Sequence, residues 1–248
     1  ALAQKGAKVA VLDLNLEAAQ KVADEIGGLA VGANVLDYAS LEKAREEVVQ
    51  RFGSCDILIN GAGGNSPKGT TTKDYFEADD LKNSEIKTFF DLDQKGVEFV
   101  FNLNFLGTLM TTQVFAKDMT EKKGVIINIS SMNAFTPLTR IPAYSGAKAA
   151  VSNFTQWLAV HFSKVGIRVN AIAPGFFLTE QNRSLLTDTD GSYTERAKKI
   201  LSQTPMERFG KAEELVGTLL YLIDDNASSF VNGVIIPVDG GFSAYSGV

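Results

Sequence analysis

The sequence predicts one α/β domain with a doubly wound parallel sheet and helices on both faces of that sheet. Short apolar segments alternate with longer helical segments through the 248 residues, the order expected for parallel strands joined by crossover helices. Two of the apolar segments end in glycine or serine, at residues 60–64 and 129–131. Ligands bind at the carboxyl ends of strands in such a fold, so these two ends are candidate parts of a functional site.

The composition excludes several kinds of protein. The chain is 45% hydrophobic and 21% charged, with a net charge of −5 and no basic run, which argues against a nucleic-acid surface. The single cysteine, Cys55, excludes an internal disulfide, is typical of a reducing cytoplasm, and is expected to be buried. The single histidine, His161, cannot build a multi-histidine metal site, so we expect it to pack structurally and predict no metal. No apolar stretch approaches the roughly 20 residues of a membrane span, and no signal peptide is visible.

The chain begins with the tail of a helix, a turn at Gly6 and an apolar strand over residues 8–12, which Asp13 follows directly. In a dinucleotide-binding fold, a carboxylate at this place accepts hydrogen bonds from the adenosine ribose and repels a 2′-phosphate. The alternative is an acidic residue that favours the start of the next helix. We favour the first interpretation, and with it NAD over NADP.

A glycine-rich turn follows the strand at residues 56–60, after a strand at 29–33 and a helix at 40–53. Its sequence is Asn60-Gly61-Ala62-Gly63-Gly64. Glycines there allow a ligand to approach the backbone where a Cβ would block it. A plain structural turn is the alternative.

Residues 65–95 are less regular than the rest of the chain, and we interpret them as an insertion that overhangs the substrate end of the sheet. A long excursion of this kind in a compact domain is usually a functional loop or a disordered one. Asn65 and Lys68 are therefore candidates for substrate contact; a solvated loop is the alternative. A long helix over residues 96–120 follows.

The strand at residues 125–129 ends in Ser130-Ser131, and Tyr144 lies thirteen residues after Ser131. Tyr144 and Lys148 lie one turn apart on one face of a predicted helix. A phenol has a pKa of about 10, and a nearby cation favours its phenolate form. Such a tyrosine can exchange a proton with an alcohol/carbonyl pair while a serine hydroxyl holds the same oxygen.

These motifs, in register along the chain, resemble the short-chain dehydrogenase/reductase family, which implies a Rossmann-like fold. The family's first strand and glycine-rich phosphate turn are missing from this sequence, so we expect a segment of roughly 20–25 residues to precede Ala1. The resemblance implies that the catalytic residues are Asn104, Ser131, Tyr144 and Lys148. In relatives, the asparagine supports a water that connects the lysine to solvent, and the lysine binds the nicotinamide ribose and lowers the tyrosine pKa.

The resemblance also implies where the cofactor binds. The expected contacts are Asp13, Asn34, Val35, Asn60, Gly61, Ala62, Gly63, Tyr144, Lys148, Pro174, Gly175 and Thr179. Asn34 stands where the family usually has aspartate. Gly61 replaces the family's second asparagine in the turn.

Residues 180–205 resemble the segment that closes over the substrate in relatives, and we expect them to be a lid. A buried substrate carboxylate would need a cationic partner. Arg183 in the lid is the first candidate, with Arg140 and Lys68 as alternatives, and Asn133 is a further candidate for substrate contact.

The resemblance is strongest to members that interconvert a sugar-acid ketone and its alcohol, D-fructuronate and D-mannonate. A related dehydrogenase of polyols or sugar acids such as gluconate is the alternative. A 3-oxoacyl-carrier-protein reductase is disfavoured because the insertion would crowd a carrier-borne chain. A Rossmann-like binding module without catalysis would have no use for the four catalytic residues together.

The resemblance finally implies a cytoplasmic homotetramer whose long helices, residues 96–120 and 144–164, pair across subunits. The second helix has apolar residues on more than one side, which is typical of a helix buried on both faces. These residues are Phe154, Trp157, Leu158, His161 and Phe162.

Overall fold

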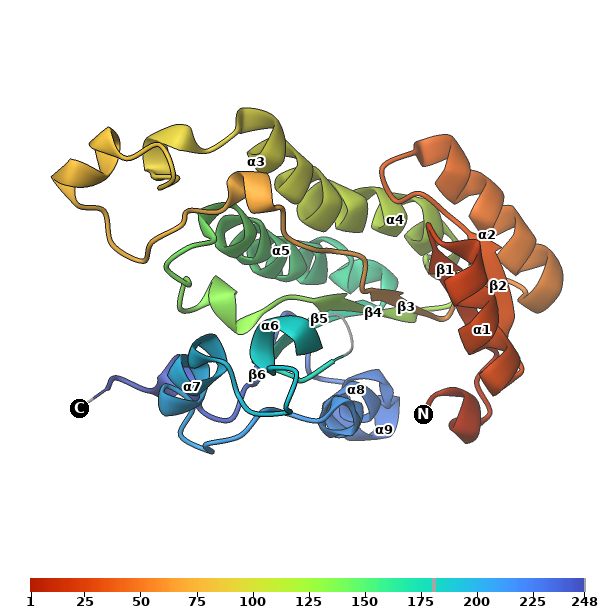
Figure 1. Ribbon diagram of the computed structural model, residues 1–248. Coiled ribbons are helices and arrows are strands. Elements are labelled where there is room, and N and C mark those ends of the chain that lie inside the picture. Colours follow the sequence, from red (N-terminus) through yellow and green to blue (C-terminus); the bar gives the residue numbers. More distant parts are fainter. Residues whose placement is uncertain (180–181, 248) are drawn as a thin grey trace.

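The computed structural model describes residues 1–179 and 182–247 and has the predicted α/β architecture (Figure 1). Parallel strands lie at the centre, with α3, α4 and α5 on one side and α6 to α9 on the other (Figure 1). The Rossmann-like fold expected from the sequence is confirmed.

All strand pairs are parallel, so the strands place their carboxyl ends at a common edge. The strands are β1 (Ala10–Asp13), β2 (Leu29–Gly32), β3 (Ile57–Asn60), β4 (Gly124–Ile129), β5 (Ile167–Pro174) and β6 (Ile235–Val238). β1 pairs with β2, and the other four follow the order β3-β4-β5-β6. Among the described residues no hydrogen-bonded ladder joins β1 to β3.

Nine α-helices occur in the part of the chain that the structure describes. They are α1 (Leu16–Ile26), α2 (Tyr38–Phe52), α3 (Gln94–Phe101), α4 (Gly107–Phe115), α5 (Pro142–His161), α6 (Arg183–Leu186), α7 (Glu195–Ser202), α8 (Val216–Ile223) and α9 (Asp225–Ser228). Side-chain caps fix several starts: Asn15 accepts from the backbone N–H of Ala18 at α1, and Asp37 accepts from those of Ala39 and Ser40 at α2.

The long helix expected over residues 96–120 is not one regular α-helix. Its backbone changes to a π-helix at Asn102–Leu106, between α3 and α4, and ends in a 3-10 turn at Ala116–Met119. The side-chain amide of Asn104 donates to the carbonyl of Val100 at 2.8 Å, and a side chain that bonds the backbone in this way competes with the helical ladder. π-segments are rare and often mark functional sites.

This helical stretch, residues 94–119, has the length and mean hydropathy (1.2) of a membrane span, contrary to the expectation from sequence, but half of it is buried. Its parts α3 and α4 pack on α5 and α2. A core helix meets the same criteria, so we interpret it as one.

The alternation of side chains along the central strands builds a core on each face. Ile126 of β4 and Val169 of β5 pack beneath α2, α4 and α5, whereas Val125 and Ile127 of β4 pack against α8. The parallel sheet is therefore covered on both sides, as its apolar strands require.

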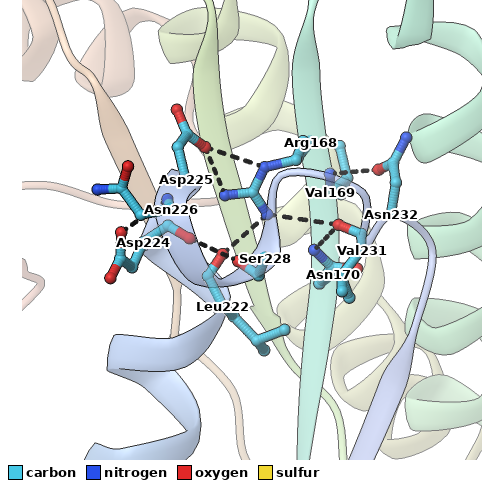
Figure 2. A network of polar contacts seen from close by, with 10 residues as sticks. All are labelled: Arg168, Val169, Asn170, Leu222, Asp224, Asp225, Asn226, Ser228, Val231 and Asn232. Atoms are coloured by element: carbon cyan, nitrogen blue, oxygen red, sulfur yellow. Dashed lines mark hydrogen bonds and ion pairs between the residues drawn. The ribbon is translucent and has the colours of Figure 1, made fainter.

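A buried arginine joins the last helices to the sheet, at the end of β5 opposite to the candidate site (Figure 2). Arg168 donates to the carboxylate of Asp225 at 2.8 Å and to the carbonyls of Leu222 and Val231 at 2.9 and 3.3 Å. Because three acceptors satisfy the guanidinium, its burial is tolerated. This network anchors α8, α9 and the segment before β6 to β5.

Cys55, which the sequence predicted to be buried, is only partly buried against the core, and His161 is exposed. Burial raises the pKa of the Cys55 thiol to about 11, so this group is a poor nucleophile. The His161 ring stacks on Trp157, with 4.5 Å between the ring centres.

Residues 65–95 contain 3-10 turns at Pro67–Gly69, Ala78–Lys82 and Phe89–Asp91 and lie beside α3 (Figure 1). The segment expected to be the lid, residues 180–205, contains α6 and α7. Its first two residues, 180 and 181, lie outside the described part of the chain.

Candidate active site

The expected site residues follow the carboxyl ends of neighbouring strands. Asp13 ends β1, Asn60 ends β3, Ser130 and Ser131 follow β4, and Pro174 ends β5. The parallel register brings β3, β4 and β5 to one edge, where a ligand binds in this architecture.

The structure brings Ser131, Tyr144 and Lys148 together. Helix α5 starts with Pro142 in its first turn, where proline is favoured, and presents Tyr144 and Lys148 on one side. The ammonium of Lys148 lies 5.7 Å from the centre of the Tyr144 ring and donates to the Ile129 carbonyl at 2.8 Å. The Ser131 hydroxyl lies close enough to the Tyr144 hydroxyl to lower the pKa of the phenol.

Burial controls the charges of this group. It raises the pKa of Tyr144 above its ordinary value, and the nearby Ser131 hydroxyl offsets this only in part. It also lowers the pKa of Lys148 to about 8. In both cases the apolar surroundings favour the neutral form. The direction for Tyr144 is opposite to the one expected from the sequence, because burial raises the pKa by more than Ser131 lowers it.

Asn104 is fully buried at the π-segment and holds the glycine-rich turn. Its amide nitrogen donates to the Gly64 carbonyl at 2.7 Å, and its oxygen accepts from the Gly64 N–H at 3.2 Å. A Cβ on Gly63 would lie 2.6 Å from the Asn104 oxygen and 3.3 Å from the Lys148 nitrogen. Only glycine allows this close approach, so the turn lies directly against the Lys148 side chain. Asn102, two residues earlier in the π-segment, is exposed.

Other features of this edge fit a nicotinamide dinucleotide. The side chain of Asp13 is exposed and accepts from the N–H of Asn15 at 2.8 Å. The space beside the backbone of Gly61 is open, since no atom lies within 4 Å of a Cβ built there. A Cβ on Gly175 would lie 2.6 Å from the backbone of Asp239, so the turn after β5 also requires glycine. Ala62 and Thr179 are exposed.

Three expected cofactor residues have roles within the protein. The Asn34 side chain accepts from the N–H of Leu36 at 3.0 Å and shapes its own turn. Val35 packs on α4, where a Cβ on Gly107 would approach it to 2.9 Å. The Asn60 amide donates to Asn128 and Thr112 at 2.9 and 3.0 Å. The Asn60 side chain is thus directed into a buried network beneath the turn.

The residues expected to contact the substrate differ in burial and in hydrogen-bond partners. Asn65 is exposed and donates to Thr70 at 3.1 Å, and Lys68 is exposed. Asn133 is buried, and its side-chain oxygen has no partner among the described residues. Arg140 donates to Asp74 at 2.6 Å, and Arg183 begins α6.

Sequence reasoning did not identify Asp74, which binds Arg140 and also Lys199 of α7. It is one of several acids in an irregular segment, and no local pattern sets it apart. Gly64 was part of the turn motif, but its interaction with Asn104 depends on a contact between residues 40 positions apart.

Comparison with known proteins gives consistent results. A family profile described as enoyl-(acyl carrier protein) reductase matches residues 1–243. A solved structure from Haemophilus influenzae, described provisionally as a D-mannonate oxidoreductase and containing bound NAD, is similar with a TM-score of 0.94 and 64% identity. The similarity extends over 100% of this chain and 90% of the Haemophilus influenzae chain.

Two further relatives are oxidoreductases. A Bacillus subtilis protein described as uncharacterized oxidoreductase UxuB is 52% identical over 100% of this chain and 90% of its own length. The 2-dehydro-3-deoxy-D-gluconate 5-dehydrogenase of Dickeya dadantii is 33% identical over 87% of this chain and 76% of its own length. The serine, tyrosine and lysine at the carboxyl edge of this sheet therefore belong to an oxidoreductase that uses a nicotinamide dinucleotide, and the chain is a member of the short-chain dehydrogenase/reductase family.

Proposed function

We propose that the protein is an NAD-dependent oxidoreductase that interconverts D-fructuronate and D-mannonate. The observation that carries the chemistry is the cluster of Ser131, Tyr144 and Lys148 beside the glycine-rich turn. The sugar-acid substrate is supported by the relatives from Haemophilus influenzae and Dickeya dadantii, whose names refer to such compounds.

In the reducing direction, the cofactor supplies a hydride for the ketone carbon when it is bound. Ser131 holds the carbonyl oxygen, and Tyr144 gives that oxygen its proton. The raised pKa of Tyr144 keeps the phenol protonated at neutral pH before the cofactor binds, which suits a proton donor. In the reverse direction Tyr144 accepts the proton, and Lys148 as an ammonium stabilises the phenolate and binds the nicotinamide ribose.

Asp13 would accept hydrogen bonds from the adenosine ribose, and its charge favours NAD over NADP. The backbone of Gly61, Ala62 and Gly63, with Pro174, Gly175 and Thr179 on the next loops, would surround the rest of the cofactor. Asn34 and Val35 would lie at the adenine end. Asn104 would position the turn and a water on the proton path from Lys148.

The substrate carboxylate is fixed in charge and needs a partner in a site that excludes water. We assign this role to Arg183, because a guanidinium can bind a carboxylate with two parallel hydrogen bonds. Arg183→Ala should raise KM for D-fructuronate tenfold or more and affect a neutral ketose much less. An equal rise in KM for both substrates would mean that Arg183 shapes the lid and does not bind the carboxylate. Arg140 or Lys68 would then be the carboxylate partner. Asn65 and Asn133 would supply polar contacts to the substrate.

The test of the function is a comparison of substrates. NADH binding is measured first by fluorescence, and then the oxidation of NADH is followed with D-fructuronate and with 5-keto-D-gluconate. We expect turnover with D-fructuronate at the higher kcat/KM. A preference for 5-keto-D-gluconate would favour the related dehydrogenase activity. NADH binding without turnover of either ketone would indicate another substrate or a binding module.

We also propose that the protein acts in the cytoplasm as a homotetramer. On α5, the side chains of Trp157 and Val160 remain 55% and 77% exposed although the opposite side of the helix is in the core. Pairing of α5 and of α3–α4 across subunits would remove this apolar surface from water. Light scattering should give four times the chain mass; a stable monomer at micromolar concentration would contradict the proposal.

A further inference from the structure

The carboxylate of Asp74 joins three segments that surround the candidate site. Asp74 lies in the insertion and accepts from the hydroxyl of Thr139 at 2.9 Å and from Nε of Arg140 at 2.6 Å. Both partners lie on the segment that connects Ser131 to α5. The other carboxylate oxygen accepts from the ammonium of Lys199, in helix α7 of the lid segment.

The insertion side of this contact is firmly placed. The N–H of Thr71 donates to the Arg140 carbonyl at 3.0 Å. A Cβ on Gly69 would lie 3.5 Å from that of Ala143, in the first turn of α5. Asp74 is therefore held against the helix that carries Tyr144 and Lys148.

The lid side has few links to the insertion. On its other side, Ala197 of α7 lies in a small apolar cluster with Leu186 and Phe209, against which the partly buried Phe176 and Leu178 pack. Among the described residues, Lys199 with Asp74 is the ion pair that connects α7 to the insertion. This ion pair therefore adds a link between α7 and the insertion to the apolar contacts that hold α7 from the other side.

The charges favour this contact, in which the carboxylate is shielded and the Lys199 side chain is 66% exposed. The side chain of Asp74 is only 15% exposed, and the two cations hold the pKa of its carboxyl far below the ordinary range. Asp74 therefore stays ionised at any pH at which the protein works. A carboxylate that is shielded and hydrogen-bonded by three partners is better ordered than an exposed surface pair.

We propose that Asp74 is a positioning residue that fixes lid helix α7 to the insertion and thereby closes the substrate site. The identity of the substrate in this inference rests on the proposed function, whereas the contacts of Asp74 do not. Asp74 does not exchange protons with the substrate; it acts through Lys199 and Arg140. Its loss should weaken the binding of the sugar acid and leave both the cofactor site and the proton donor in place.

The test uses Asp74→Asn, which keeps the shape of the side chain and removes its charge. We expect KM for the sugar acid to rise at least tenfold, with kcat within about threefold and NADH affinity unchanged. Lys199→Met should have the same effect, and the double variant should be no worse than either single variant, since both remove one contact. Asp79→Asn is the matched control, because Asp79 lies in the same insertion, is 87% exposed and pairs only locally with Lys82.

Hydrogen exchange separates this inference from the proposed function. Amides of residues 195–202 should exchange faster in Asp74→Asn and Lys199→Met than in wild type and Asp79→Asn, whereas amides of β4 should not change. Faster exchange without any sugar-acid activity in wild type would keep the role of Asp74 and reject the proposed substrate. Unchanged exchange in α7, or equal losses of kcat and NADH affinity in Asp74→Asn, would overturn the role.

Discussion

The side chain of Asn104 hydrogen-bonds both backbone groups of Gly64: it donates to the carbonyl at 2.7 Å and accepts from the N–H at 3.2 Å. This contact fixes the turn after β3 to the π-segment between α3 and α4. The same glycine-rich turn lies against the side chain of Lys148 at Gly63. One buried amide thus sets the distance between the expected cofactor surface and the helix that carries Tyr144 and Lys148.

Replacement of Asn104 by aspartate should therefore weaken cofactor binding. The carboxylate cannot donate to Gly64 and would face its carbonyl, so the turn would move. We expect NADH affinity to fall at least tenfold, about 1.4 kcal/mol, measured by fluorescence titration. Asn102→Asp changes an exposed residue of the same π-segment and should have no effect; equal losses in both variants would contradict the role of Asn104.

Tyr144→Phe should remove the proton donor and leave the cofactor surface intact. The expected loss in kcat is at least about 10³-fold, or about 4 kcal/mol of barrier. Steady-state kinetics and NADH titration measure the two effects separately. Tyr221→Phe, on α8, is the control with wild-type kinetics. A Tyr144→Phe enzyme within tenfold of wild type would show that another group transfers the proton.

Asp13→Ala should narrow the preference for NAD over NADP by at least tenfold, about 1.4 kcal/mol, because it removes the charge that repels a 2′-phosphate. The ratio of kcat/KM with the two cofactors is the measurement. Glu17→Ala removes an acid from the first turn of α1, after the end of β1, and should leave the ratio unchanged. A wild-type enzyme that prefers NADPH would reject the argument.

Lys148 should make the stability of the cofactor-free protein depend on pH. Burial lowers its pKa from 10.5 to about 8, so between these values the unfolded chain binds a proton that the folded chain has released. The state that binds more protons is favoured at low pH, so the contribution of Lys148 to the free energy of unfolding rises with pH across this window. The rise is at most about 3 kcal/mol.

The measurement compares urea unfolding of wild type and Lys148→Met at several pH values between about 7.5 and 10. The comparison is needed because the raised pKa values of Cys55 and Tyr144 lower stability at high pH in both proteins. Wild type should gain stability relative to Lys148→Met as pH rises. Parallel curves would mean that Lys148 keeps its ordinary pKa.

The sequence alone determined the parts of this protein that depend on local order. Alternation of strands and helices predicted the sheet and its carboxyl edge. The one-turn spacing of Tyr144 and Lys148, with a serine after the preceding strand, predicted that these three side chains lie together. Each of these signals follows from backbone periodicity, which depends on neighbouring residues and not on contacts with distant ones.

Only the tertiary structure decided the features that depend on distant contacts or on burial. The ion pair of Asp74 with Lys199 joins residues 125 positions apart, and no pattern in either segment indicates the other. The amide of Asn104 in the π-segment bonds Gly64, 40 positions away, and the side chain of Asn60 joins a buried network with Asn128. Burial raises the pKa of Tyr144, and this burial comes from all the residues packed around the phenol. The sequence spacing to Lys148 describes only one nearby charge and so could not predict it.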